Sequence, residues 1–148
     1  KKIPKYLKQI INITFSKVEL STFNDRFCNF YDKLPNITPD FIYIDAPSNF
    51  DVRGEHSGVS FNSTDRTIMI ADLLKIEPLL LPGTFILLDG RTNNSRFLRN
   101  NLQRSYDYIE DKEGDINTFE LREFPLGKIN ETQIIFSLGQ KWIDSLKK

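Results

Sequence analysis

Two short segments of the chain share one pattern, four consecutive apolar residues closed by an aspartate. They are "FIYID" (residues 41–45) and "FILLD" (residues 85–89). A run that is apolar at every position predicts a strand covered on both faces, which is typical of a parallel sheet flanked by helices. We therefore interpret both segments as central strands of an α/β fold.

Helices are expected after each of these strands. Ser63 or Thr64 suits the N-cap of a first helix, whose apolar residues between Met69 and Ile76 crowd one broad face until Pro78 ends it. A second helix is expected over residues 92–105, capped by Asn93 or Asn94. Strand, helix and strand in this order predict a right-handed crossover between parallel strands.

The remaining apolar segments complete the expected fold. Residues 117–124 and 132–138, joined by "PLGKINE", predict an antiparallel pair of strands, and residues 11–20 alternate well enough for a further strand. The expected fold class is a Rossmann-like, mostly parallel sheet with helices on both faces and an antiparallel C-terminal hairpin. A chain of 148 residues fits a single α/β domain over residues 1–148.

The amino-acid composition limits the kinds of partner and the location that we expect. The 20 basic residues balance the 20 acidic ones, so nothing draws the whole chain toward nucleic acid or an anionic membrane. No apolar run reaches the ~20 residues of a membrane span, and we expect a cytoplasmic protein. The single cysteine, Cys28, lies among aromatic residues and is interpreted as a buried thiol. No Walker loop, CxxC, HExxH or GxSxG motif occurs.

The two terminal aspartates are the main candidate site. Ligands of open α/β sheets bind outside the carboxyl ends of the strands, where Asp45 and Asp89 are both expected. Adjacent strands lie ~4.8 Å apart, so both carboxylates would face one ligand. The alternative is structural, since an aspartate after a strand also caps a helix or closes a turn.

The polar loops after these strands add further candidates. His56, the only histidine, lies in a loop rich in Gly, Ser and Asn, and imidazole is the side chain that most often serves as a general base. An exposed loop histidine with no role is the competing interpretation. Arg53 and Arg91 follow the two strands and are candidates for holding an anionic ligand, although surface arginines usually have no such role.

The order of these parts resembles the C-terminal half of a class I S-adenosylmethionine-dependent methyltransferase. The matching stretches are "PDFIYIDAPSN" and "LLLPGTFILLDGRTNN", followed by the expected antiparallel pair, and together they cover residues 11–138. The glycine-rich cofactor loop of that family has no counterpart, because none of the seven glycines forms a GxGxG motif. The resemblance therefore predicts the C-terminal portion of a methyltransferase-like domain.

The resemblance implies roles for named residues. Asp45, Ala46 and Pro47 would line the space between S-adenosylmethionine and a small-molecule or sugar acceptor. His56 would be the base, and Asp89, Arg91 and Asn93 would border the acceptor. A portion lacking its first strands would expose apolar surface and an unpaired edge, so we expect it to form homo-oligomers or to associate with the missing N-terminal half.

Two other functions remain open from the sequence. Asp45 and Asp89 would hold a divalent metal such as Mg²⁺ in a hydrolase or phosphotransferase that uses His56, although two carboxylates are a small ligand set. The third hypothesis is a non-catalytic methyltransferase-like module. It predicts that Asp45→Ala and His56→Ala leave biological activity intact.

Overall fold

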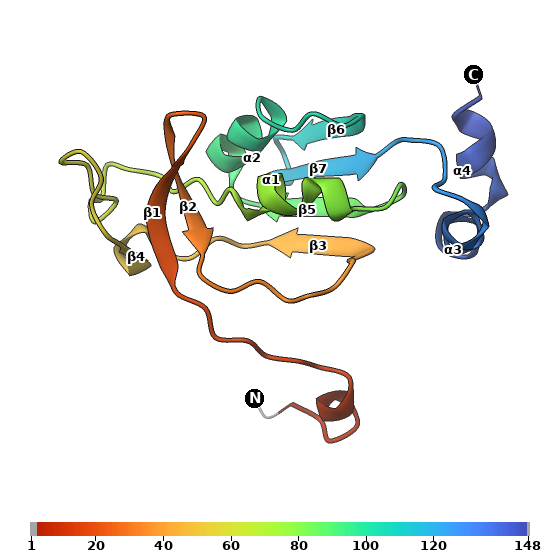
Figure 1. Ribbon diagram of the computed structural model, residues 1–148, viewed down its shortest axis with the longest axis horizontal. Helices are drawn as coiled ribbons and strands as arrows, with labels where there is room; N and C mark the ends of the chain where they lie inside the picture. Colours follow the sequence, from red (N-terminus) through yellow and green to blue (C-terminus); the bar gives the residue numbers. More distant parts are fainter. Residues whose placement is uncertain (1–2, 148) are drawn as a thin grey trace.

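The computed structural model describes residues 3–147, which form two small sheets with helices beside them (Figure 1). The strands are β1 (Val18–Phe23), β2 (Arg26–Tyr31), β3 (Phe41–Ile44), β4 (Val52–Arg53), β5 (Phe85–Asp89), β6 (Tyr106–Asp111) and β7 (Ile116–Leu121). The helices are α1 (Asp72–Ile76), α2 (Thr92–Arg99), α3 (Lys128–Leu138) and α4 (Gln140–Ser145). Short 3-10 turns occupy Leu7–Gln9, Asn49–Asp51 and Glu77–Leu79.

The larger sheet has four strands in the order β3-β5-β7-β6. β3 and β5 are parallel, as the sequence predicts, with Ile44 opposite Leu88. β7 runs antiparallel to both of its neighbours, β5 and β6. The smaller sheet, β2-β1-β4, contains a β1–β2 hairpin closed by Asn24 and Asp25. Both of these residues have positive φ, 48° and 60°, as a type I′ turn requires.

The expected Rossmann-like, mostly parallel sheet with helices on both faces is wrong. The strands form two mixed sheets, and the four-stranded one is covered on one face only. Along β5 the buried residues Ile86 and Leu88 alternate with the half-buried residues Phe85 and Leu87, and β7 shows the same alternation. The core lies between this face, β2, α1 and α2, and it includes the fully buried Phe119 and Cys28. The expectation of a buried thiol at Cys28 is thereby confirmed.

The first expected helix is also largely wrong, because only Asp72–Ile76 is α-helical. Met69 and Ala71 bond to β2 instead: the Asn29 N–H donates to the Met69 carbonyl at 2.8 Å, and the Ala71 N–H donates to the Asn29 carbonyl at 2.9 Å. These bonds hold residues 69–71 beside β2 as a parallel β-bridge instead of a helical turn. Helix α2 begins at Thr92 and makes no side-chain cap hydrogen bond, so neither Asn93 nor Asn94 is its cap.

The C-terminal part differs most from expectation. The antiparallel hairpin pairs β6 with β7, and residues 132–138 lie within helix α3 rather than in a strand. Gly139, with a φ of 85°, ends that helix, and α4 packs back onto α3 through Trp142 and Ile143. Figure 1 shows α3 and α4 at one end of the molecule. No helix within residues 3–147 has the length and apolar character needed to cross a membrane.

The expected strand over residues 11–20 forms only from Val18 onward. Residues 11–17 carry no regular secondary structure and make no strand pair. Figure 1 shows this segment leaving the sheets and ending in the turn at Leu7–Gln9.

Candidate functional site

Asp45 and Asp89 do lie side by side at the carboxyl ends of two adjacent parallel strands of the four-stranded sheet. Asp45 directly follows β3, Asp89 is the last residue of β5, and the parallel register places the preceding Ile44 opposite Leu88. The predicted placement of the two aspartates at one edge is therefore confirmed. It arises because each apolar run forms a strand and the intervening crossover makes the two strands parallel.

The two carboxylates have different partners, and neither is used to cap its own turn. Arg91 Nη2 lies 3.3 Å from Asp45 Oδ1 and donates to the Ala46 carbonyl oxygen at 2.6 Å. Arg91 thus joins the loop after β5 to the loop after β3. The Asp45 side chain is 63% exposed, so the ion pair adds little to stability and leaves most of the carboxylate open to a ligand.

Asp89 accepts a hydrogen bond of 2.8 Å from the Tyr43 hydroxyl. This bond raises the pKa of Tyr43 above its usual value, because an ionised phenol would face the carboxylate. Tyr43 points from β3 toward the end of β5, so the two strands are tied together by a side-chain bond next to the Arg91 contact. Sequence analysis missed Tyr43, whose only signal is one hydroxyl within an otherwise apolar strand.

A polar hollow of about 210 Å³ opens between the loops after β3 and β5. We call it the polar hollow; its lining includes Pro47, Asn49, Arg66, Thr67, Arg91 and Asn93. Two arginines and no acidic residue line it, so its electrostatics favour an anionic or strongly polar ligand. Arg66 donates to the Ser60 carbonyl oxygen, and the Asn93 amide donates to the Thr67 hydroxyl at 2.6 Å.

One side of the polar hollow is held in place by the buried side-chain amide of Asn94. Asn94, 1% exposed, accepts from the Ile70 N–H at 2.9 Å and donates to the Ile70 carbonyl at 3.0 Å. This pair fixes the start of α2 against the segment that leads into α1. Arg66 and Thr67 enter the site on that same segment, and sequence analysis missed them because it assigned these residues to the first helix.

A second hollow, of about 390 Å³, runs along β3, and we call it the edge groove. Its lining is mainly apolar and includes Phe41 and Tyr43 from one face of β3 together with Ile42 and Ile44 from the other. Because alternate side chains of a strand point to opposite faces, a hollow that touches all four lies at the edge of the sheet. Asp45 and Ala46 border this groove, whereas Pro47 borders the polar hollow.

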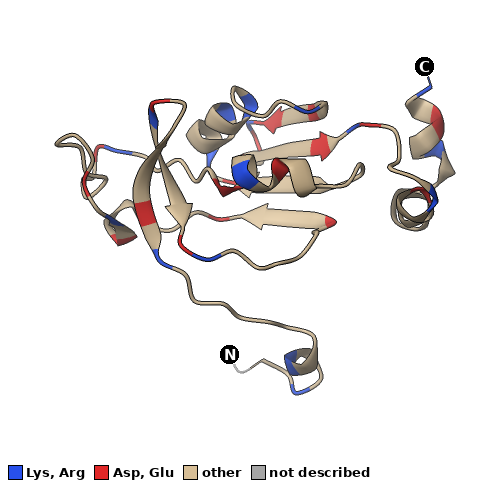
Figure 2. Ribbon diagram, in the orientation of Figure 1, with Lys and Arg blue, Asp and Glu red and all other residues tan. Residues whose placement is uncertain are grey.

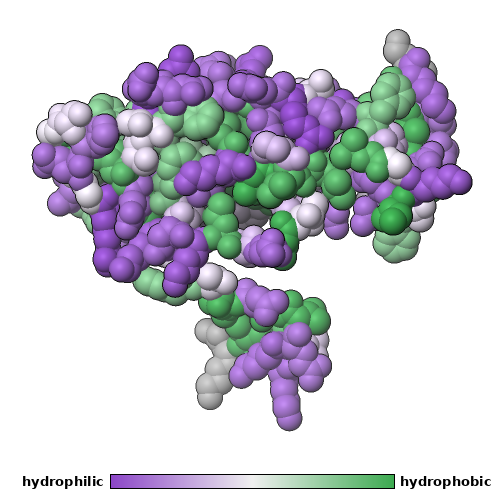
Figure 3. Space-filling model, in the orientation of Figure 1, coloured by the Kyte–Doolittle hydropathy of each residue, from purple (hydrophilic) through white to green (hydrophobic). Residues whose placement is uncertain are grey.

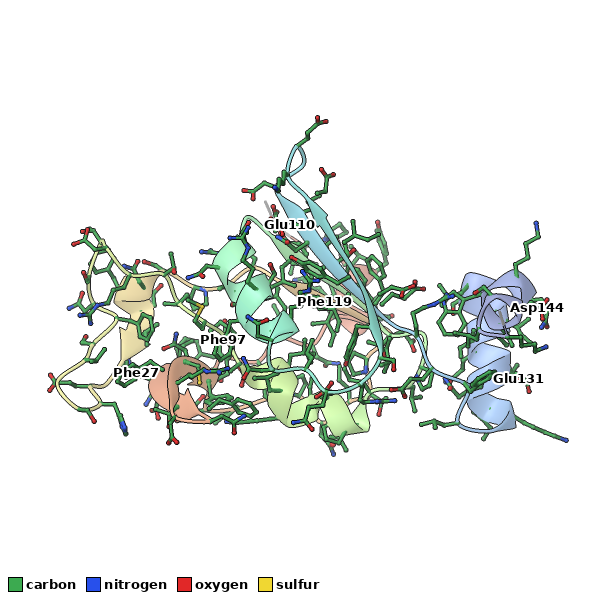
Figure 4. All side chains as sticks on the ribbon, turned by 90° about the horizontal axis from the view of Figure 1, so that it is seen from above. Phe27, Phe97, Glu110, Phe119, Glu131 and Asp144 are labelled. Atoms are coloured by element: carbon green, nitrogen blue, oxygen red, sulfur yellow. The ribbon has the colours of Figure 1, made fainter. Side chains whose placement is uncertain are left out.

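His56 and Arg53 are not brought to these hollows. His56 is exposed, its backbone forms a reciprocal pair of 2.9 Å bonds with Val59, and its ring lies edge-on to Phe27 with centroids 5.8 Å apart. Figure 4 labels Phe27 at the end of the molecule opposite α3 and α4. Arg53 belongs to the smaller sheet, opposite Glu19 of β1. A role of His56 as base stays a prediction.

Within residues 3–147, no three His, Cys, Asp or Glu side chains are arranged so as to hold a metal ion. Of the three residues in the metal-assisted hypothesis, only Asp45 and Asp89 lie at one edge. Comparisons with models of protein families, with curated proteins and with solved structures find no match for this chain.

Proposed function

We propose that this chain takes part in methyl transfer from S-adenosylmethionine to an oxygen or nitrogen atom of a small acceptor bound in the polar hollow. One observation carries the proposal. The segment Asp45–Pro47 stands between two hollows of different chemistry at the carboxyl end of a parallel strand pair. The resemblance implies the same position for this segment, between cofactor and acceptor. Ligands of α/β proteins bind at that edge.

The charges suit the two reactants. S-adenosylmethionine carries a positive sulfonium, and the exposed Asp45 carboxylate would attract it. On the other side of Pro47, Arg66 and Arg91 would attract an anionic or polar group on the acceptor. As the acceptor atom bonds to the methyl carbon, the bond from sulfur to that carbon breaks and the sulfonium becomes a neutral thioether. The proton of the acceptor O–H or N–H group passes to a base or to water. Positioning would therefore supply most of the rate.

The hairpin after β5 also supports the proposal. The resemblance implies an antiparallel pair following the fifth strand, and β6 and β7 supply one, although at other residues than expected.

The proposal includes a cytoplasmic location, which rests on the sequence alone. It does not require a metal, and His56 is retained as a residue to test.

Titration calorimetry with S-adenosylmethionine tests the proposal directly. We expect binding by the intact chain that weakens about fivefold in Asp45→Asn, because a charge pair near the surface contributes about 1 kcal/mol. Asp40→Asn is the matched control: Asp40 precedes β3 at its opposite end and is exposed. No heat at millimolar cofactor, or equal weakening in both variants, would count against the proposal.

A second experiment addresses the acceptor side. In NMR titrations, acceptor analogues that carry a carboxylate or phosphate should shift the amide signals of Arg66, Thr67 and Asn93, whereas neutral analogues of equal size should not. Arg66→Ala should abolish the preference for the anionic analogue without changing cofactor binding. Shifts confined to the loop around His56 would place the acceptor elsewhere.

A further inference from the structure

The edge groove lies along a strand whose outer side has no partner. β3 is the last strand of its sheet, and within residues 3–147 no other strand pairs with it beyond β5. Phe41 is 55% exposed and Tyr43 51%. An apolar strand edge with free N–H and C=O groups is a site for adding a strand.

The other open edge of this sheet is protected. β6 alternates exposed and half-buried residues, and its exposed side carries Asp107 and Asp111. Charged residues on an edge strand oppose pairing with another strand. β3 has no charged residue between Phe41 and Ile44. Residues 34–39 border the groove on its outer side but form no strand pair with β3.

Residues 10–16, which we call the arm, have the complementary property. They form no strand, yet Ile11, Ile13 and Phe15 alternate with polar residues, which is the pattern of a strand with one apolar face. Ile13 and Phe15 are each 81% exposed. Figure 3 shows apolar side chains on this segment, which stands apart from the body of the molecule.

Two hydrogen bonds hold the C-terminal end of the arm, at Ser16 and the following Lys17, against the body of the molecule. The Ser16 hydroxyl donates to Asp32 Oδ1 at 2.7 Å, and the Lys17 N–H donates to the same oxygen at 2.8 Å. These bonds join this end of the arm to the residue that follows β2. Further along the arm, Ile13 and Phe15 remain largely exposed.

The charges of the arm and the groove are opposite. Lysines flank the arm at Lys8 and Lys17, and no acidic residue occurs from Ile3 to Val18. The edge groove is lined by Asp72 and by Asp45, which Arg91 also contacts, and no basic residue lines it. Figure 2 shows basic but no acidic segments between the N-terminal end and β1. Pairing β3 with β3 of another copy in antiparallel register would instead bring Asp40 near Asp45 at both ends, which like charges oppose.

We infer that the arm of one copy adds as a strand to the free edge of β3 in a second copy, and that the exchange is reciprocal, so that the chain forms a two-fold symmetric dimer. Seven extended residues span ~23 Å, which exceeds the ~13 Å of the four-residue strand β3. The inference goes beyond the proposed function. The arm would fill the part of the edge groove beside Phe41–Ile44, so the cofactor of the proposed function would bind at the end of the groove formed by Asp45 and Ala46.

The first test measures mass by sedimentation equilibrium over a range of concentrations. The natural chain should be dimeric, and the double variant Ile13→Lys with Phe15→Lys should raise the dimer dissociation constant about a hundredfold, since two apolar side chains lose their burial. Ile129→Lys is the matched control, because Ile129 is 80% exposed on α3. A natural chain that stays monomeric at millimolar concentration, or a double variant that dimerises equally well, would overturn the inference.

The second test locates the arm. Phe15→Cys is labelled with a nitroxide and mixed with isotope-labelled natural chain; Cys28 is fully buried and burial raises its pKa to about 11, so the label attaches at position 15. We expect broadening of the amide signals of residues 41–44 and 34–39 in the isotope-labelled copy. Broadening confined to β6 or to α3 would refute the exchange at β3.

Discussion

Arg91 donates a hydrogen bond of 2.6 Å to the carbonyl oxygen of Ala46, across the gap between the two parallel strands. The bond joins loops that lie 45 residues apart in the chain, and the same guanidinium meets Asp45 at 3.3 Å. The segment Asp45–Pro47, which separates the polar hollow from the edge groove, is therefore held by one side chain from the loop after β5.

Replacing Arg91 should increase local opening of the loop after β3 more than it lowers the free energy of unfolding of the whole chain. Arg91→Ala should lower the free energy of unfolding by only about 1 kcal/mol, the usual contribution of one partly exposed hydrogen bond. In contrast, hydrogen exchange at the amides of Ala46 and Ser48 should accelerate. Arg96→Ala is the control, because Arg96 lies in α2, bonds Glu110 of β6 and does not line the polar hollow. Equal acceleration in both variants would argue against a local role of Arg91.

Asn94 should matter far more for stability. Asn94→Ala leaves the buried N–H and C=O groups of Ile70 without partners, and we expect a loss of about 2–4 kcal/mol in urea unfolding. Asn93→Ala, a change at the exposed neighbour, should cost no more than about 0.5 kcal/mol. Similar losses in the two variants would contradict the arrangement described for Asn94.

Two carboxyl groups should show opposite pH dependence. Burial raises the pKa of Asp72 in the folded chain, so its contribution to stability is full at low pH and is lost as the pH rises through that raised value. The hydrogen bond from Arg104 lowers the pKa of Glu123, so its contribution is present at neutral pH and is lost as the pH falls through the lowered value.

Urea unfolding at pH 3 and pH 7 measures both effects. The free energy of unfolding of the natural chain minus that of Asp72→Asn should be smaller at pH 7 than at pH 3. The free energy of unfolding of the natural chain minus that of Glu123→Gln should be larger at pH 7 than at pH 3. Dependences of the same sign would contradict the two opposite environments.

Gly83 should tolerate no side chain. It has a φ of 90°, and an added Cβ would lie 3.1 Å from Ile134 Cγ1 and 3.3 Å from Leu138 Cδ1 of α3. Gly83→Ala should therefore cost more than the ~1–2 kcal/mol of backbone strain alone. Gly127→Ala isolates that strain, since Gly127 has the same φ and open space around it. Thermal unfolding of the two variants gives the difference, and equal melting temperatures would mean that α3 yields freely.

Local patterns predicted the parts of this protein that depend on burial and chain direction. The runs at residues 41–45 and 85–89 are strands, they pair in parallel, and their aspartates share one edge. A purely apolar run also led to the wrong expectation of helices on both faces, because half-buried Phe85 and Leu87 have the same apolar character as buried Ile86. Apolar character alone does not tell whether a neighbour covers a side chain.

The sequence by itself thus determined that residues 41–44 and 85–89 form strands, where the acidic ends of these two strands lie and that Cys28 is buried, because these outcomes follow from local apolar character and chain direction. Only the tertiary structure decided that residues 69–71 bond to β2 instead of forming a helix, that residues 132–138 form a helix instead of a strand, and that Tyr43, Arg66 and Arg91 meet the two aspartates or the polar hollow between their loops. The physical reason is that these outcomes depend on hydrogen-bond partners distant in the chain, which no local pattern contains.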